Sequence, residues 1–155
     1  MSKPIKTPKP TLAVFAWVAA LFLLASCAVR LVSPYDETMD RGISNFHEKV
    51  TAFVVKMESV AGRPEGTYDA NKDAYADLRA SVVTLRMRAA ATPLDEATRT
   101  SLDEVIHNID NLVRLHSAAG TGGLKSAVGD PALAAIDVQC ESILRFEIAK
   151  KRGDN

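Results

Sequence analysis

The sequence predicts an all-α fold, an antiparallel up-down four-helix bundle over residues 35–153, preceded by an amino-terminal leader. Three observations support this. Apolar residues recur in alternating steps of three and four through four stretches, as in amphipathic helices. Residues that favour helix starts or ends bound each stretch. No stretch alternates apolar and polar residues for long enough to be a convincing strand. Four such helices joined by short loops bury their apolar faces against one another.

The first helix is expected over residues 35–61. Ser33 is a favourable N-cap, Pro34 suits the first helical position, and Asp36 completes the resemblance to a capping box. Glycine and proline between residues 62 and 66 end the helix. The expected buried face comprises Tyr35, Met39, Ile43, Phe46, Val50, Phe53, Met57 and Val60.

The second helix is expected over residues 69–91, starting near Asp69 and ending before Pro93. Proline is tolerated poorly inside a helix, so the chain must turn there. The expected buried face comprises Tyr75, Leu78, Val82, Leu85 and Ala89.

The third helix is expected over residues 93–119. The sequence Thr92-Pro93-Leu94-Asp95 repeats the capping pattern of the first helix, which predicts a very short connection. Gly120 stands just past the end, where glycine is favoured. The expected buried face comprises Leu94, Leu102, Val105, Ile109, Leu112 and His116, widened by Ile106 and Val113.

The fourth helix is expected over residues 131–152, capped by Asp130 and Pro131. The basic residues 150–152 complement the helix dipole in the last turn, and Gly153 ends the helix. The expected buried face comprises Leu133, Ile136, Cys140, either Ile143 or Leu144, and either Phe146 or Ile148.

Composition excludes several classes of protein. The chain has 155 residues, which suits one domain. Its zero formal net charge excludes a general nucleic-acid binder that coats phosphates with cations. A charged fraction of 25% with ordinary apolar content excludes a wholly disordered chain. Two cysteines are too few for a disulfide-rich scaffold.

Residues 1–26 have the pattern of a secretory signal peptide. Lys3, Lys6 and Lys9 stand in a segment without acids, and the apolar run 12–25 follows. The positive end of such a segment stays in the cytoplasm, so the chain beyond it is expected outside the cytoplasm.

The end of this segment, Leu24-Ala25-Ser26-Cys27, resembles the lipobox of bacterial lipoproteins. The resemblance implies cleavage between Ser26 and Cys27 and a diacylglycerol on the Cys27 thiol, often with a third acyl chain on the new amino terminus. Residues 27–34 would then be the lipidated cysteine and a short tether. Two or three acyl chains anchor a protein firmly, because each buried methylene contributes about 0.8 kcal/mol.

Two other interpretations of the leader stay open. The stretch Leu12–Val29 holds 18 residues without a charge and is just long enough to span a bilayer as an uncleaved helix. Alternatively, Cys27 is incidental. By resemblance to lipoproteins, Ala28 instead of aspartate after the cysteine implies sorting to the outer membrane if the host is Gram-negative.

The glycine-rich segment 120–129 does not match a phosphate-binding loop. Leu124 precedes Lys125 where a P-loop requires glycine, and Lys125 also replaces the third glycine of a dinucleotide fingerprint. A hinge between helices is the simpler interpretation. Gly122, Gly123 and Lys125 remain candidate contacts, because a glycine loop can adapt its shape to a partner.

The histidines do not form a metal motif. The sequence lacks Glu-x-x-His, His-Glu-x-x-His and Cys-x-x-Cys. His107 shares a helix face with Asp103 and Asp110, which is either a weak surface metal site or an ordinary set of helix pairs. We therefore expect no metal.

Haem is a second possibility for a helical bundle. A haem iron can be held between a methionine and a histidine of different helices, and Met39 or Met57 with His116 or His107 supplies these ligand types. The sequence for covalent haem attachment is absent, and methionine on an apolar face is usually core filler. We therefore expect no cofactor.

Cys140 is the other cysteine, and it falls on the apolar face of the fourth helix. A buried cysteine behaves as a small hydrophobic side chain, which is the favoured interpretation. An intermolecular disulfide is the alternative, since an odd cysteine outside the cytoplasm can pair between chains. No histidine lies near Cys140 in sequence to activate it as a nucleophile.

Arg79 and Arg86 are two turns apart and share a face of the second helix. This basic stripe is either a contact surface for an acidic or phosphate-bearing partner, or a solvated helix face. The sequence holds no Gly-x-Ser-x-Gly turn and no distinct pair of catalytic carboxylates, so an enzyme is not expected.

Together these features favour a lipid-anchored helical interaction module that faces the periplasm and acts as adaptor, accessory or inhibitor of an envelope protein. Its membrane partner is the bilayer, through acyl chains on Cys27, and no nucleic acid is expected. The alternative is a bundle that binds haem, a metal or an apolar small molecule between its helices.

Overall fold

The computed structural model describes residues 32–153. The leader, with Ser26, Cys27 and the tether up to residue 31, lies outside the described residues. The described part holds the α-helices α2 (Glu37–Ser59), α3 (Lys72–Ala91), α4 (Glu96–Ala119) and α5 (Ser126–Gly153). Short 3-10 turns lie between them, namely η1 (Pro64–Gly66), η2 (Asp69–Asn71) and η3 (Gly120–Gly122), and no strand occurs in residues 32–153. The predicted all-α class is confirmed.

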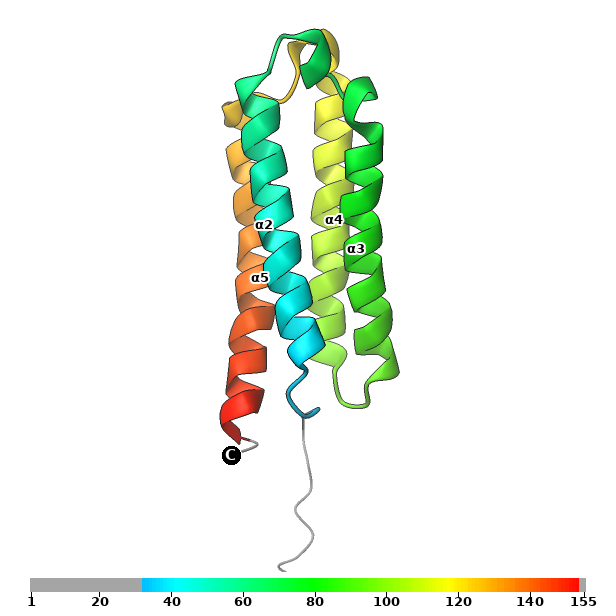
Figure 1. Ribbon diagram of the computed structural model, residues 1–155, viewed down its shortest axis with the longest axis vertical. Coiled ribbons are helices and arrows are strands. Elements are labelled where there is room, and N and C mark those ends of the chain that lie inside the picture. Colours follow the sequence, from blue (N-terminus) through cyan, green and yellow to red (C-terminus); the bar gives the residue numbers. More distant parts are fainter. Residues whose placement is uncertain (1–31, 154–155) are drawn as a thin grey trace, which may run out of the picture. The chain divides into compact units, whose positions relative to one another are not determined.

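The four helices form an antiparallel bundle in which sequence neighbours pack side by side (Figure 1). α2 packs against α3 and α5, and α4 packs against the same two helices. We call the end where α2 begins and α5 ends the entry end, and the opposite end, with η1, η2 and η3, the loop end. The predicted up-down four-helix bundle is confirmed. None of the helices within residues 32–153 combines the length and the apolarity needed to cross a membrane.

The core consists of the stripes that the spacing predicts, with a few exceptions. Val54 is fully buried in place of Phe53, which is partly buried and packs on the core edge. Ile143 is buried, Leu144 and Phe146 are partly buried, and Ile148 is exposed. The fully buried apolar side chains include Met39, Ile43, Val50, Val54, Met57, Val82, Leu102, Val105, Leu112, Leu124 and Ile136.

The predicted cap of the first helix is wrong. Asp36, not Ser33, is the N-cap, because its Oδ1 accepts the backbone N–H groups of Thr38 and Met39 at 2.9 and 3.1 Å. The helix therefore runs over Glu37–Ser59 rather than 35–61. Ser33 is buried and bonded elsewhere, so its hydroxyl is not available to cap.

The second and third helices also start later than predicted. The 3-10 turn η2 occupies residues 69–71, and the α-helix follows from Lys72. α4 begins at Glu96, because Leu94 adopts a positive φ of 64° that no helix residue can have. Leu94 is 57% exposed, so its predicted place on the buried face is wrong.

The fourth helix starts earlier than predicted, at Ser126 instead of 131, and includes Gly153. The backbone N–H groups of Val128 and Gly129 both donate to the Lys125 carbonyl at 2.8 Å, which begins the helix before Pro131 is reached. Pro131 then lies inside the helix rather than at its first position. The connection between the last two helices, predicted over the glycine-rich segment 120–129, is therefore reduced to residues 120–125.

Candidate functional site

A buried ionic cluster occupies the entry end of the bundle. The Lys150 ammonium donates to Asp95 Oδ1 and to Glu147 Oε1, each at 2.6 Å. All three side chains are at most 2% exposed. The hydroxyls of Ser33 and Thr98 also donate to Asp95 Oδ1, each at 2.9 Å. A buried charge requires such partners, because removing it from water costs several kcal/mol.

This cluster joins three separate parts of the chain. Asp95 precedes α4, Glu147 and Lys150 belong to the last turns of α5, and Ser33 precedes α2. Glu147 Oε2 also accepts the backbone N–H of Asp36 at 2.9 Å. Hydrogen bonds thus hold residues 33–36 against the start of α4 and the end of α5.

Asp36 extends the cluster to α3. Its carboxylate accepts two hydrogen bonds from the Arg88 guanidinium in addition to the two cap bonds. Burial by itself would raise the pKa of Asp36, but the bonds from Arg88 and from the backbone of Met39 and Thr38 outweigh it and lower the pKa below its ordinary value. Asp36 is therefore a stable anion in the folded protein.

This cluster is not predicted from the sequence, although its two residues on α5 stand at the spacing of the buried face. Glu147 and Lys150 continue the series Ile136, Cys140 and Ile143 in steps of four and three. From the sequence, Lys150 is predicted only to complement the helix dipole, because its pairing with Asp95 involves a different segment of the chain. The signal that could have found them is the periodicity itself, applied without regard to polarity.

A second buried polar group lies at the loop end. His116 is fully buried, its Nε2 lies 2.8 Å from the Gly66 carbonyl, and its Nδ1 lies 2.8 Å from the Tyr75 hydroxyl. A carbonyl only accepts, so Nε2 donates to it and Nδ1 accepts from Tyr75. Burial, with a smaller contribution from Tyr68, raises the pKa of Tyr75 above its ordinary value, so the hydroxyl keeps its proton.

This arrangement bears on the haem hypothesis. Both ring nitrogens of His116 already have partners, so neither is available to an iron atom without breaking a buried hydrogen bond. Met39 and Met57 are fully buried in the core. His107 is exposed on α4, whereas both methionines are inside the core. The residues present do not fit an axial ligand pair in this conformation.

The acidic residues beside His107 pair with arginines rather than with a metal. Arg79 Nε lies 3.0 Å from Asp110 Oδ1, and Arg86 Nε lies 2.8 Å from Asp103 Oδ1. Within residues 32–153, no group of three or more histidine, cysteine or acidic side chains has the geometry to hold a metal ion. Arg79 and Arg86, the basic stripe predicted on the second helix, therefore form two ion pairs between α3 and α4.

The connection between α4 and α5 is more ordered than its glycine content suggests. Leu124 is fully buried, and Gly123 is buried with a φ of 65°. A side chain on Gly123 would also approach the Gly66 carbonyl to 2.8 Å, so this glycine serves a close contact with the η1 segment. Gly122 is half-buried, and Lys125 is exposed.

Cys140 lies in the core, where it is 1% exposed. Burial, aided by the charge of Asp137, raises the pKa of its thiol to about 12. A thiol of this kind is not ionised at neutral pH, and its predicted role as a buried hydrophobic side chain agrees with this. It is not placed to pair with a second chain.

One oxygen of a carboxyl group is also buried at the loop end. Glu58 Oε1, on α2, is inaccessible and makes no hydrogen bond to any described residue. Burial raises the pKa of Glu58, and the nearby Asp130 carboxylate raises it further. A Cβ atom on Gly129 would lie 2.2 Å from Oε1, so Gly129 leaves the space that this carboxyl occupies.

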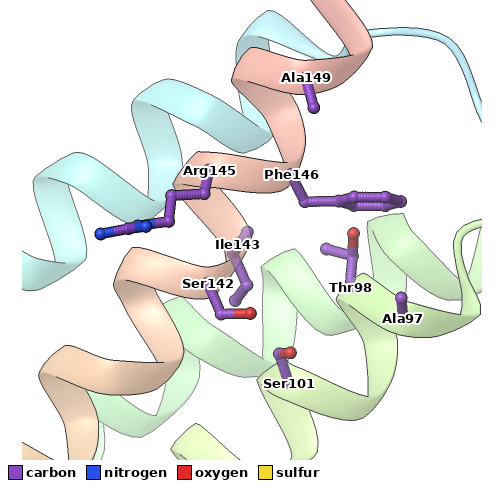
Figure 2. A pocket seen from close by; sticks show the side chains of 8 residues that line it. All are labelled: Ala97, Thr98, Ser101, Ser142, Ile143, Arg145, Phe146 and Ala149. Carbon is purple, nitrogen blue, oxygen red and sulfur yellow. The ribbon is translucent and has the colours of Figure 1, made fainter.

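The seam between α4 and α5 carries two surface concavities. The one at the entry end has a volume of about 330 Å³ and is lined mainly by small side chains from both helices, together with the larger Phe146 and Arg145 of α5 (Figure 2). The one toward the loop end has a volume of about 420 Å³, and its lining includes Leu115, Val128 and Ala135. Neither concavity is lined by a carboxylate.

A third concavity, of about 260 Å³, lies between α2 and α3. It differs from the other two because Lys49 and Asp77, two oppositely charged side chains, line it. The α4–α5 seam is therefore the less charged of these surfaces. Comparison of the chain with protein-family models, with curated proteins and with solved structures gives no match.

Proposed function

We propose that this protein is a bacterial lipoprotein whose helical bundle is held at a membrane through acyl chains on Cys27, faces the periplasm and docks on an envelope protein without catalysing a reaction. The lipobox Leu24-Ala25-Ser26-Cys27 supports the anchor. In a Gram-negative host, Ala28 after the cysteine favours the outer membrane. Confinement to a surface raises the effective concentration of the bundle for any partner there.

The entry-end cluster supports an anchored role. Four residues, 28–31, separate Cys27 from the first described residue, Val32, so the five residue steps between them span at most about 18 Å. Ser33 and the Asp36 backbone are then fixed to α4 and α5 by buried hydrogen bonds. A short tether that ends in a rigid attachment keeps the entry end close to the membrane and leaves the long helix faces accessible.

One observation carries the docking role, namely the concave α4–α5 seam, whose two concavities are lined by no carboxylate. Three polar groups are internal, because Lys150, His116 and Cys140 are all buried and the first two have internal partners. The α4–α5 surface, in contrast, exposes Val138 at 62% and Leu115 at 37%. Exposed apolar surface rimmed by polar residues is typical of protein contacts.

Two measurements test this proposal. In cells fed a labelled fatty acid, the wild-type chain is expected to incorporate label, while Cys27→Ser is expected to stay unlabelled and uncleaved. Cys140→Ser is the matched control and is expected to be processed as wild type. Normal processing of Cys27→Ser would overturn the anchor. In-cell crosslinking of the tagged full-length chain then tests for a single dominant envelope partner.

A ligand-binding bundle is the competing function, and the concavity in Figure 2 favours it because Thr98 and Phe146 connect that surface to the buried ionic cluster. The absorption spectrum of the purified protein tests for haem, and mass spectrometry of an organic extract tests for an apolar molecule. A stoichiometric ligand without a protein partner would replace docking by ligand binding.

A further inference from the structure

The loop-end half of the α4–α5 seam differs from the other exposed helix surfaces. Six exposed apolar residues lie along it, and we call them the α4–α5 apolar patch: Leu115, Ala127, Val128, Pro131, Ala135 and Val138. The first five line the concavity of about 420 Å³, and Val138 continues the same ridge of α5 one turn farther. The patch has no internal segment to cover it among residues 32–153.

Two cations without acidic partners stand beside this patch. Arg114 lines the concavity, and Lys125 immediately precedes α5. Both are exposed, and neither forms an ion pair with a described residue. The acid one turn before Arg114, Asp110, is bonded to Arg79 across the α3–α4 seam instead.

Most other arginines of the bundle do pair with carboxylates, as Arg79, Arg86 and Arg88 do. The lining of the concavity holds Arg114 as its one charged residue, together with the amide side chains of Asn108 and Asn111. Asn108 donates to the Ala135 carbonyl, whereas Asn111 has no hydrogen-bond partner among the described residues. The surface is thus apolar along its length and positive at one rim.

We propose that the α4–α5 apolar patch binds an amphipathic helix of an envelope protein whose apolar stripe is flanked by glutamate or aspartate facing Arg114 and Lys125. This deepens the proposed docking function and rests on it. The concavity runs from residues 108 and 135 to residues 115 and 128, which is about 10 Å, or two helical turns. Such a length suits apolar anchors spaced at i, i+3 or i+4, and i+7.

A second copy of this chain fits the surface less well. A two-fold contact places each patch on its equivalent, so Arg114 and Lys125 of both copies meet an uncharged surface. Asp130, the nearest acid on α5, faces Glu58 on the other side of the helix, as its effect on that carboxyl shows. Charge complementarity therefore favours a different chain that brings its own carboxylates.

The test begins with a photo-crosslinking amino acid placed at Leu115, Ala135 or Val138 of the full-length chain in living cells. Val55, on α2, is the matched control position, because its exposure of 57% is close to the 62% of Val138. Mass spectrometry then locates the crosslinked segment. We expect one helical segment with an apolar stripe and adjacent acids, captured from the three patch positions and not from Val55.

The captured segment is next synthesised as a peptide, and its affinity for purified variants is measured. Arg114→Glu and Val138→Asp are each expected to weaken binding by about tenfold or more, because one reverses the rim charge and the other places a carboxylate on the apolar surface. The matched controls Lys49→Glu and Val55→Asp are expected to bind within about twofold of wild type. Circular dichroism confirms that every variant is folded.

Several results would overturn the inference: crosslinks to a second copy or to phospholipid, equal capture from Val55, a segment without acids, unchanged binding by Arg114→Glu, or no product from the patch. Failure of the docking function itself has a different signature. If a partner is captured only from other faces while Cys27 is acylated, the proposed function stands and the patch assignment is wrong. If Cys27 carries no lipid, the anchor is wrong whatever the patch binds.

Discussion

The ammonium group of Lys150 lies 2.6 Å from the carboxylate of Asp95, a residue 55 positions earlier in the chain. Both side chains are almost completely buried. The contact joins the end of α5 to the start of α4, and through Ser33 it also holds the segment that leads into α2. A single buried cation thus connects three chain segments at the entry end.

Lys150→Met tests how much this connection contributes to the free energy of unfolding. The substitution keeps the apolar stem but leaves Asp95 and Glu147 buried without their cation, so the free energy of unfolding is expected to fall by about 3–5 kcal/mol. Urea denaturation measures the change. Arg152→Met, an exposed cation in the same helix turn, is the control and is expected to change stability by less than about 0.5 kcal/mol. Equal stability of the two variants would show that the cluster does not hold the entry end.

Tyr75→Phe tests the hydrogen bond to His116. Loss of the hydroxyl leaves the buried Nδ1 acceptor without a donor, so a destabilisation of about 1–3 kcal/mol is expected. Tyr68→Phe is the matched control, because Tyr68 packs in the same aromatic group but makes no hydrogen bond through its hydroxyl among the described residues. If both variants unfold at the same urea concentration, the His116 assignment is wrong.

Glu58→Gln is expected to stabilise the protein at neutral pH. Burial and the Asp130 charge raise the pKa of Glu58 in the folded state, so ionisation of Glu58 costs stability as the pH rises above its ordinary value of 4.5. Glutamine carries no charge and avoids this cost. Thermal unfolding at pH 7 is expected to show a higher Tm than wild type, and the difference is expected to vanish near pH 3, where Glu58 is protonated in both states of the wild type.

The matched control for this experiment is Glu48→Gln, an exposed acid on the same helix, which is expected to leave the Tm nearly unchanged at both pH values. A lower Tm for Glu58→Gln at pH 7 would mean that the carboxylate is stabilised by its surroundings rather than destabilised.

Cys140 is expected to be unreactive in the folded protein. Its pKa of about 12 and its burial keep the thiol protonated and inaccessible, so the Cys27→Ser chain is expected to react with a thiol reagent only after unfolding. Counting reactive thiols with and without guanidinium measures this. Rapid reaction of the native protein would indicate that α5 opens locally around Cys140.

Much of the fold could be predicted, because the buried face of each helix in a bundle is indicated by the spacing of apolar residues within that helix. The series Leu102, Val105, Ile109 and Leu112 is buried as its spacing predicts. Helix ends were predicted less well. The prediction that Ser33 caps the first helix is wrong. The Ser33 hydroxyl donates to Asp95, a residue distant in sequence, instead of bonding to the start of its own helix. The prediction that Leu94 is buried is wrong for a similar reason, because the turn between two packed helices sets its backbone conformation.

The candidate site was harder to predict, because its residues acquire their roles from other helices. Arg79 and Arg86 are a free basic stripe in the sequence, but the antiparallel register of α3 and α4 sets Asp110 and Asp103 opposite them. Arg114 is not predicted as a site residue, and it has no acidic partner because Asp110, one turn earlier, pairs with Arg79. Lys125, a candidate contact from the sequence, remains exposed beside the patch.

The sequence by itself determined the leader pattern, the all-α class, the number of helices in the described part, and most of the buried face of each, because these follow from residue spacing within one segment. Tertiary structure alone decided which polar residues are buried and which apolar residues are exposed. Glu147 and Lys150 enter the core because Asp95 meets them there, and Val138 stays outside because α5 is apolar on more than one side. Such outcomes depend on the register between helices, which local periodicity does not specify.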